Sequence, residues 1–513
     1  MTDTATAGEP RPAAAAGSAA RAPHETGPVE NVHHARRWLI LAVIGIAQLM
    51  IVLDATIVTI ALPDAQKALG FNNGDRQWIV TAYSLAFGGL LLFSGRLADL
   101  IGRKRTFILG LIGFGLASAL GGAAPNFEVL VTARALQGAA GALLAPAALS
   151  LLTTTFTEPK ERGTAFAVFG GIAGSGAAIG MLLGGLLTEY FNWRWTLFVN
   201  VGFTFVALAG AFTLLHTQRS AHRPRLDLFG TVIVSGALFC LVYGFSNAAS
   251  HPWSAPSTWV FLVAAAVGLT VFGWWQTRTA HPLLPLRILL DRDRGGSFAA
   301  VFISGAGMFG VFLFLTYYLQ TMLGYSPVRT GLAFLPMVAI LMLAATLATT
   351  RLLGAVGARP LVTLGMALSA AGMAWLTGIA VTTSYTTHIL GPLLIVGVGI
   401  GLVIAPAMSV ATFGVDPDDA GVASALVNTM QQIGGSIGTA LLNTLATAAA
   451  TSYLVGRRPT PPVLAQAQLH SYTTAFWWSA GIFALGAIVS GLLLRPGVQH
   501  STGGPDAAPA VHT

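Results

Sequence analysis

Charged residues are scarce in this sequence. Asp, Glu, Lys and Arg make up 9% of its 513 residues and hydrophobic residues make up 54%, whereas soluble domains have about 25% charged residues. The mean hydropathy is +0.71. These values predict a protein that crosses a membrane many times. The formal net charge of +8 does not indicate nucleic-acid binding, because Lys and Arg fall in short loops between apolar runs.

Cysteine and the motifs of common enzymes are also missing. The single cysteine, Cys240, lies in an apolar run, which excludes disulfides and a cysteine-based metal site. The sequence has no His-x-x-x-His pair with a carboxylate, no Gly-x-Ser-x-Gly and no phosphate-binding Gly-x-x-x-x-Gly-Lys-Ser/Thr loop. An ATP-driven pump would need such a loop here or in a separate subunit. We therefore expect a protein that is not an enzyme and uses no metal or cofactor.

Fourteen apolar segments are long enough to cross a bilayer as helices, which takes about 20 residues each. An even number places both termini on one side. With both termini cytoplasmic, the inside segments hold twenty Lys and Arg and the outside loops hold six, as the positive-inside rule requires. The first run is too long for the core of a signal peptide, so we expect no cleaved signal. The segments lie near 38–62, 77–97, 106–124, 127–153, 163–187, 196–215, 228–247, 257–275, 297–320, 330–350, 360–380, 388–412, 420–445 and 472–494.

An internal repeat divides these segments into two halves. A shift of 258 residues superposes Ala165 on Ala423, and a shift of 255 superposes Gly102 on Gly357. The sequence therefore predicts an all-α membrane protein with two six-helix bundles in the same orientation, a design that places a transport site at the interface of the halves. The expected parts are a disordered cytoplasmic tail at 1–37, bundles at 38–215 and 297–494, a linker at 216–296 with two extra transmembrane helices, and a cytoplasmic tail at 495–513.

Asp54 is the acid that the sequence places deep in the membrane. It lies in the apolar run 38–62, where a carboxylate costs roughly 2.5–3.5 kcal/mol and must face protein or a water-filled cavity. Arg134 is the deep cation, in the fourth segment. Counted from the outer ends of their helices, the two residues lie at similar depths of roughly 10–13 Å. They predict a proton-coupling site with a switchable ion pair; a permanent structural pair is the alternative.

The loop between the second and third segments combines glycine, one acid and several cations. Glycine permits a tight reversal of the chain, and an acid beside four cations indicates ion pairing. We expect a cytoplasmic gating loop; a merely basic loop that obeys topology is the alternative. Its marked residues are Gly95, Arg96, Asp99, Gly102, Arg103, Lys104 and Arg105.

This loop resembles the signature of the major facilitator superfamily, which has the form Gly-x-Leu-Ala-Asp-x-x-Gly-Arg-Lys/Arg. The first predicted helix departs from the family's usual pattern at one position, where Thr59 stands in place of Asn. The resemblance implies an antiporter that exports amphipathic drugs or antibiotics, with the proton gradient as its energy source. The further stretches similar to the fourteen-helix drug:proton antiporter family are Leu53 to Pro63, Arg134 to Gly138, and Trp193-Arg194-Trp195 with Phe198 and Asn200.

The fifth segment departs from the pattern of exporters. The family usually carries Gly-x-x-x-Gly-Pro-x-x-Gly-Gly, and here Met181 replaces the proline. Glycines at four-residue spacing let helices approach closely, so both tight packing and a hinge are open interpretations. Pro146 and Pro406 could supply kinks in segments four and twelve. The glycines that remain are Gly176, Gly180, Gly184 and Gly185.

Polar and aromatic side chains on segments expected near the cavity are candidate substrate contacts. Plain helix packing is the alternative for most of them. The sequence places no second carboxylate deep in the membrane, so a dication would lack a second counter-charge there. We therefore expect neutral or monocationic amphipathic substrates. The candidates are Gln48, Gln137, Phe309, Phe312, Tyr317, Tyr318, Asn428, Gln431 and Gln432.

Three acids occupy an inside loop that has no Lys or Arg, between segments twelve and thirteen: Asp416, Asp418 and Asp419. In the fold that this chain resembles, the loop at 95–105 approaches them, so its cations would face the acids. The repeat then predicts a mirror arrangement, in which Arg351 and Arg359 face Glu158 and Glu161. Both latches would close the cytoplasmic side. The alternative is that the three acids merely start helix thirteen favourably.

The sequence thus predicts a monomeric, multi-pass antiporter of the cytoplasmic membrane. Its expected partners are amphipathic small molecules, protons and the lipid bilayer, with no nucleic acid. A proton-coupled importer or metabolite exporter of the same fold is one alternative. A non-transporting membrane sensor is the other, and it would have no need of Asp54. A fold does not determine its substrate, so the compound stays open.

Overall fold

A computed structural model describes residues 36–156, 158–215, 227–247, 255–280, 282–413, 415 and 420–497. The described residues form helices joined by short turns and contain no strand, which confirms the predicted fold class. Eleven helices among them are long and apolar enough to cross a membrane. Helices α2 (Gln77–Ile101), α5 (Pro159–Tyr190) and α13 (Ala358–Leu376) add three more of comparable length, one for each remaining predicted segment. Of the tail predicted to be disordered at 1–37, residues 1–35 lie outside the described residues, and Arg37 begins α1.

The first six helices pack with one another into an N-terminal bundle. Several of their ends follow from local chemistry: Asn126 caps α4 by accepting a hydrogen bond from the Val129 amide at 3.0 Å, and Gly70 ends α1 in the left-handed conformation. Besides α2 and α5, the bundle contains α1 (Arg37–Leu69), α3 (Arg103–Gly122), α4 (Phe127–Thr155) and α6 (Trp195–Leu214).

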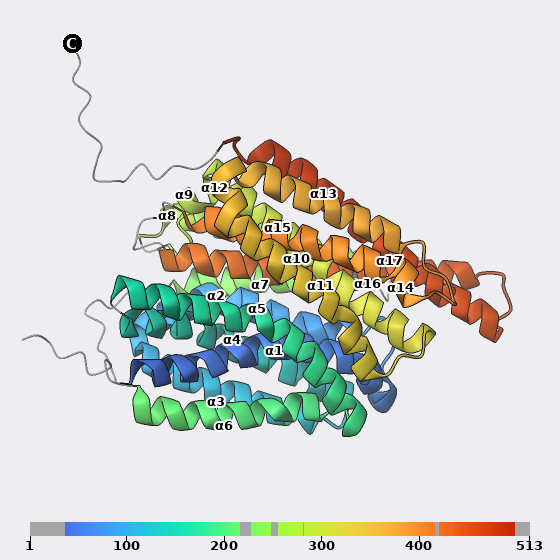
Figure 1. The fold of residues 1–513 in the computed structure, drawn as a ribbon, viewed down its shortest axis with the longest axis horizontal. Coiled ribbons are helices and arrows are strands. Elements are labelled where there is room, and N and C mark those ends of the chain that lie inside the picture. Colours follow the sequence, from blue (N-terminus) through green and yellow to red (C-terminus); the bar gives the residue numbers. More distant parts are fainter. Residues whose placement is uncertain are drawn as a thin grey trace, which may run out of the picture.

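A C-terminal bundle repeats this arrangement, and Figure 1 shows it above the N-terminal one. Two of its spans contain a π-helical stretch, η1 (Tyr318–Met322) after α10 and η2 (Ala348–Leu352) between α11 and α12. Besides α13, the bundle contains α9 (Leu286–Leu290), α10 (Arg292–Tyr317), α11 (Pro327–Leu347), α12 (Leu353–Val356), α14 (Tyr385–His388), α15 (Leu390–Thr412), α16 (Ala420–Leu454) and α17 (Pro461–Leu493).

Matching glycines support the internal repeat. Gly102 joins α2 to α3 with φ of 96°, and Gly357 joins α12 to α13 with φ of 78°. Both angles lie in the region that favours glycine. The two positions are those superposed by the shift of 255 residues, so the same reversal occurs once in each bundle.

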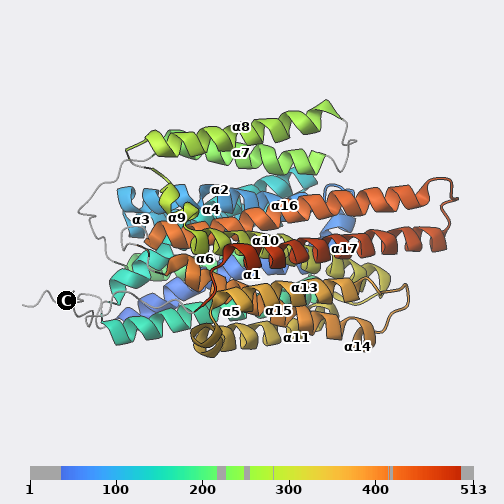
Figure 2. The same cartoon turned by 90° about the horizontal axis from the view of Figure 1, so that it is seen from above.

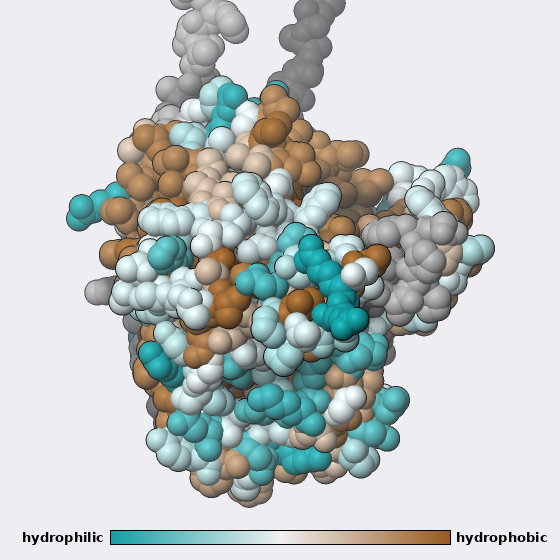
Figure 3. Space-filling view, turned by 90° about the vertical axis from the view of Figure 1, so that its right-hand side faces the viewer, coloured by the Kyte–Doolittle hydropathy of each residue, from teal (hydrophilic) through white to brown (hydrophobic). Residues whose placement is uncertain are grey.

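The two ends of the molecule are named here by the chain. The proximal end carries the start of α1 and the end of α17, and the distal end carries α14 and the turn between α16 and α17 (Figure 1). Figure 3 looks at the distal end, where hydrophilic and intermediate residues cover much of the face and apolar surface begins toward its upper edge. Such a distribution is typical of a membrane protein whose ends reach water.

The extra helices α7 (Leu228–Asn247) and α8 (Pro256–Arg278) lie together along one flank, while α5 and α11 lie on the other (Figure 2). Helix α7 contacts α2 of one bundle and α16 of the other. The Ser235 hydroxyl donates to the Gly89 carbonyl at 3.0 Å, and the Thr444 hydroxyl donates to the Phe245 carbonyl at 3.1 Å. Helix α7 therefore lies across the seam between α2 and α16.

Candidate functional site

Asp54 and Arg134 form an ion pair inside the N-terminal bundle. Arg134 Nη1 lies 2.5 Å from Asp54 Oδ2, and both side chains are buried, at 0% and 1% exposure for the two residues. The matched depth predicted from the sequence thus corresponds to direct contact. A buried ion pair needs further hydrogen bonds to offset the loss of water.

Two side-chain amides donate to Asp54, and a hydroxyl accepts from one of them. Gln137 Nε2 donates to Asp54 Oδ1 at 3.0 Å and lies 2.7 Å from the Ser118 hydroxyl. Asn200 Nδ2 donates to the same carboxylate oxygen at 2.7 Å. Gln137, predicted as a substrate contact, is therefore part of the buried acid's surroundings. The sequence pattern did contain a signal, because Gln137 follows Arg134 by three residues and so shares its helix face.

The remaining contacts hold the guanidinium of Arg134. Its Nε donates to the Ile79 carbonyl at 3.0 Å, and its Nη1 also donates to Gln137 Oε1 at 2.9 Å. The guanidinium lies over the Tyr83 ring, 4.4 Å from the centroid. All these partners come from helices of the N-terminal bundle. The cluster can hold a carboxylate without water, and a proton added to Asp54 would remove its charge.

Glycines of α5 pack the helix against both bundles. A Cβ on Gly184 would lie 2.8 Å from the Ile57 carbonyl oxygen on α1, and one on Gly185 would lie 2.7 Å from the Pro327 carbonyl oxygen on α11. Gly176 and Gly180 also face α1, beside Val52 and Thr56. These positions support the packing interpretation of the glycines.

Met181 continues α5 where the exporter pattern has proline. It is 2% exposed, and its carbonyl oxygen lies 2.5 Å from where a Cβ on Gly331 of α11 would be. The helix therefore runs unbroken through this point and touches the opposite bundle there. Pro146 and Pro406 also lie inside continuous helices, α4 and α15.

The predicted gating loop is shorter than expected. Helix α2 continues to Ile101 and α3 begins at Arg103, so Gly102 alone joins them and Gly95, Arg96 and Asp99 belong to α2. The side chains of Arg96 and Asp99 lie outside the described part. The Lys104 ammonium donates to the Leu215 carbonyl and caps the end of α6; Arg105 is exposed and Arg103 half-buried.

The predicted proximal latches are not formed among the described residues. Glu161 pairs with Arg37 at 2.5 Å, within its own bundle, rather than with Arg351 or Arg359. Glu158 is exposed. Asp416, Asp418 and Asp419 lie outside the described residues. Because the latches were predicted for a closed cytoplasmic side, their formation in another conformation stays a prediction.

A network at the distal end joins the two bundles, and the sequence analysis missed it. Arg76 is 3% exposed, and its Nε donates to Asn443 Oδ1 of α16 at 3.0 Å. Its guanidinium lies 4.4 Å from the ring centroid of Tyr317, whose hydroxyl donates to Gln66 Oε1 of α1 at 2.5 Å. Arg76 lies in the predicted outside loop between the first two segments, and no residue pattern there marks it as buried.

Two more contacts close the distal end. Gln320 Nε2 donates to the Ile60 carbonyl at 2.9 Å, and the Val328 amide donates to Glu189 Oε2 at 3.0 Å. Midway along the seam between α2 and α16, the Thr429 hydroxyl donates to the Gly88 carbonyl at 3.3 Å. The hydrogen bonds between the bundles in the described part thus gather toward the distal end. The conformation is closed on that side.

The predicted substrate contacts are not brought into one site. The Tyr318 hydroxyl donates to the Ala380 carbonyl at 2.6 Å within the C-terminal bundle, and its contact with substrate stays a prediction. Phe312 packs against Phe334, and Asn428 donates to the Ser424 carbonyl of its own helix. The side chain of Phe309 lies outside the described part. Half-buried side chains are found at Gln48, Gln431 and Gln432.

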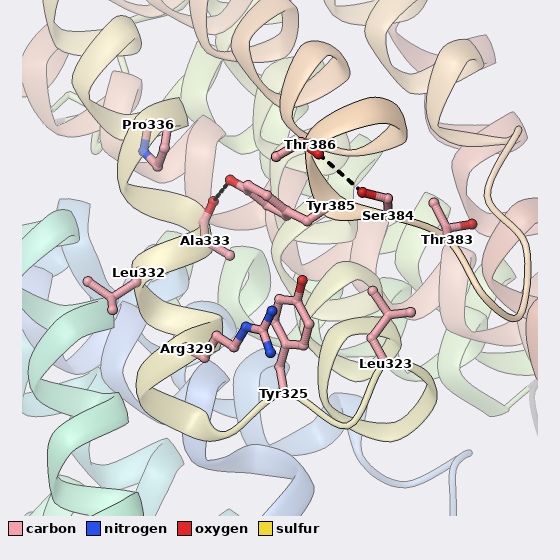
Figure 4. Close-up of a pocket in the computed structure, with 10 residues that line it drawn as sticks. All are labelled: Leu323, Tyr325, Arg329, Leu332, Ala333, Pro336, Thr383, Ser384, Tyr385 and Thr386. Carbon is pink, nitrogen blue, oxygen red and sulfur yellow. Dashed lines mark hydrogen bonds between the residues drawn. The ribbon is translucent and has the colours of Figure 1, made fainter.

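A hollow of about 640 Å³ lies at the distal end of the C-terminal bundle, between α11, α14 and the turn at 323–325 (Figure 4). The Arg329 guanidinium lies over the Tyr325 ring, 3.8 Å from the centroid. The Tyr385 hydroxyl donates to the Ala333 carbonyl at 2.6 Å. Its lining residues all belong to the C-terminal bundle, and none is part of the Asp54 cluster.

Comparison with known proteins identifies the family. The sequence profile of the Major Facilitator Superfamily matches residues 44–439. The chain belongs to this superfamily. It is 47% identical over 479 residues to the puromycin resistance protein pur8 of Streptomyces alboniger, covering 93% of this chain and 95% of that protein. It is 38% identical over 428 residues to the cephamycin export protein CmcT of Amycolatopsis lactamdurans, covering 83% and 88%.

Solved structures of the superfamily share the fold. A POT family peptide transporter matches with a TM-score of 0.66 and 17% identity, over 90% of this chain and 98% of that one. A bacterial homologue of the human lysosomal transporter Spinster, in an inward-facing and unoccupied conformation, matches with a TM-score of 0.63 and 15% identity, over 91% and 98%. The family match and these shared folds identify the chain as a multi-pass membrane protein of the major facilitator type.

Proposed function

We propose that this superfamily member is a proton-coupled antiporter that exports amphipathic drugs or antibiotics across the cytoplasmic membrane. The observation that carries the proposal is Asp54, a fully buried carboxylate on a transmembrane helix, held by one cation and two amides. An intramembrane acid with a single cationic partner is a group that can bind and release a proton. Relatives named for puromycin resistance and cephamycin export support the direction and the substrate class.

The proximal end is cytoplasmic in this proposal, because the inside segments carry most of the Lys and Arg. The distal contacts then close the outside, and substrate enters from the cytoplasm while Asp54 is an ion-paired carboxylate. When the distal end opens, substrate leaves and Asp54 takes up a proton from outside. The inward proton gradient thus drives export, with no cofactor.

The test is Asp54→Asn, assayed in everted membrane vesicles with puromycin and ethidium as probes. We expect the variant to reach the membrane and to lose transport driven by a pH gradient, because an amide cannot exchange the proton. Asp64→Asn is the matched control, since Asp64 lies on the same helix but is only half-buried and pairs loosely with Lys67 at 3.7 Å. Undiminished pH-driven transport by Asp54→Asn would refute the proton role.

A further inference from the structure

The contacts of Asp54 share one property: each is a donor. Arg134 Nη1 approaches Oδ2 at 2.5 Å, and the amide nitrogens of Gln137 and Asn200 approach Oδ1 at 3.0 and 2.7 Å. This arrangement suits a carboxylate, which only accepts hydrogen bonds. A protonated Asp54 needs one acceptor for its O–H group. None of the three contacts provides it as they stand.

Asn200 has the acceptor that the acid needs. Its Oδ1 is buried and has no hydrogen-bond partner, and the residue is 0% exposed. The other amide oxygen nearby, Gln137 Oε1, already accepts from Arg134 at 2.9 Å. A buried polar atom without a partner is rare and calls for an explanation. Here it lies on the side chain that contacts the proposed proton carrier.

We propose that Asn200 accommodates both protonation states of Asp54 by rotating its side-chain amide. With the carboxylate, the NH2 group donates to Oδ1, as in the structure. When a proton from water adds to Oδ1 and forms the neutral acid, half a turn about the Cβ–Cγ bond brings the Asn200 oxygen to the same place. It then accepts the new O–H.

The rotation fits the geometry and the hydrogen-bond count. The exchanged oxygen would lie near the present 2.7 Å from Asp54 Oδ1, a usual O–H···O distance. The terminal torsion of asparagine is broad and roughly two-fold, so both orientations are accessible. In each protonation state of Asp54, one end of the Asn200 amide has a hydrogen-bond partner and the other end has none. The two protonation states therefore have equal numbers of hydrogen bonds from this residue.

The charged and titratable neighbours of Asp54 come from two helices. Arg134 on α4 pairs with it, and Tyr83 on α2 lies against the guanidinium. Asn200 of α6 donates to Asp54, Ser118 of α3 accepts from Gln137, and neither side chain titrates. Gly180 of α5 packs on Leu53 and Thr56 beside Asp54 and carries no side chain. Asn200 is therefore the group in the described cluster that can supply an acceptor without changing its own charge.

The inference rests on the proposed proton coupling and is tested with Asn200→Leu, which keeps a similar volume but neither donates nor accepts. We expect pH-driven efflux of puromycin to fall by at least about tenfold, the equivalent of one buried hydrogen bond of about 1.4 kcal/mol. Puromycin exchange at equal pH on both sides should persist, because it requires no protonation of Asp54. Proton release on puromycin binding, followed in weak buffer with a pH dye, should be lost.

Two further variants separate this role from a structural one. Asn200→Ser retains a hydroxyl that can donate or accept, and should recover part of the efflux and of the proton release. Thr204→Val is the control. Thr204 lies one turn further along α6, where its hydroxyl donates to the Met50 sulfur at 3.4 Å. This variant should behave as wild type.

The outcomes distinguish the two hypotheses. Wild-type efflux and proton release in Asn200→Leu, with Asp54→Asn inactive, would overturn the role of Asn200 and leave the proton coupling intact. pH-driven efflux by Asp54→Asn would overturn the proton coupling itself. Loss of exchange as well as efflux in both Asn200 variants would show that the residue acts through the fold, and would also contradict the proposal.

Discussion

At the scale of single residues, the charge of Asp54 is balanced by one cation. A buried pair is a weak source of net stability, because the loss of water from both ions cancels much of their attraction. Removing only one partner is different, since the other charge stays buried alone. The stability lost on removing one partner, compared with the stability lost on removing both, therefore distinguishes a functional pair from a stabilising one.

We expect Arg134→Gln to destabilise the protein by about 3–5 kcal/mol, because the Asp54 carboxylate loses its cation. The double variant Asp54→Asn/Arg134→Gln should recover most of that stability while remaining inactive in pH-driven efflux. Thermal unfolding of the purified protein in detergent measures the first, and vesicle transport measures the second. Equal instability of the single and double variants would contradict this balance.

The sequence predicts this pair because depth along a helix can be counted from its ends. It does not predict that Gln137 and Asn200 contact Asp54, because depth does not fix which neighbour a side chain faces. Asn200 was still visible as a polar residue in the apolar segment 196–215. Arg76 could not be recognised, because the burial of a loop cation depends on residues more than 300 positions away, such as Asn443.

At the scale of helices, α5 connects the proton site to the opposite bundle. Gly180 and Gly184 pack on the turn of α1 that follows Asp54, and Gly185 packs on Pro327 of α11. Successive glycines on one helix thus touch α1 and α11 in turn. We expect a movement of α1 around Asp54 to reach the distal contact through α5.

We expect Gly185→Ala to weaken distal closure. The added Cβ would lie 2.7 Å from the Pro327 carbonyl oxygen, and such overpacking costs about 1–3 kcal/mol. An impermeant thiol reagent, applied to a cysteine placed at Gln66 in a Cys240→Ser background, should react faster. Gly202→Ala on α6 is the control, since nothing lies within 4 Å of its Cβ position. Unchanged reactivity in Gly185→Ala would contradict a closing role for this contact.

Helix ends were harder to predict than helices. Helix α17 begins at Pro461, eleven residues before the predicted 472, and α1 continues through Pro63 to Leu69. Hydropathy marks where a helix leaves the apolar layer, whereas the helix itself ends where its capping residues allow. The stretch 461–471 is rich in Ala, Leu and Gln, which are good helix formers. It therefore stays helical beyond the expected span.

At the scale of the whole molecule, the distal end is closed, while in the described part Glu161 at the proximal end is not paired with Arg351 or Arg359. Glu161 pairs with Arg37 in this conformation. We expect it to exchange Arg37 for Arg359 when the proximal end closes. Each such pair is worth only about 0–1 kcal/mol, so single neutralisations should be mild.

A charge reversal tests this exchange. Glu161→Arg and Arg359→Glu should each reduce puromycin efflux, and the double variant should recover it at matched expression. The control is Arg458→Glu, in the turn between α16 and α17 at the other end of the molecule. Additive loss in the double variant would mean that the two residues do not meet.

The position of α7 makes the two seams of the transporter unequal. Leu238 and Val242 of α7 are buried against Leu85 of α2 and Ile433 of α16, so one seam lies beneath an added helix. The seam between α5 and α11, on the opposite flank in Figure 2, has no such cover among the described helices. A compound that dissolves in the membrane before the transporter binds it therefore finds the α2–α16 seam covered by α7 and the α5–α11 seam uncovered in the described part. We expect such a compound to enter on the α5–α11 side, because α7 covers the α2–α16 seam.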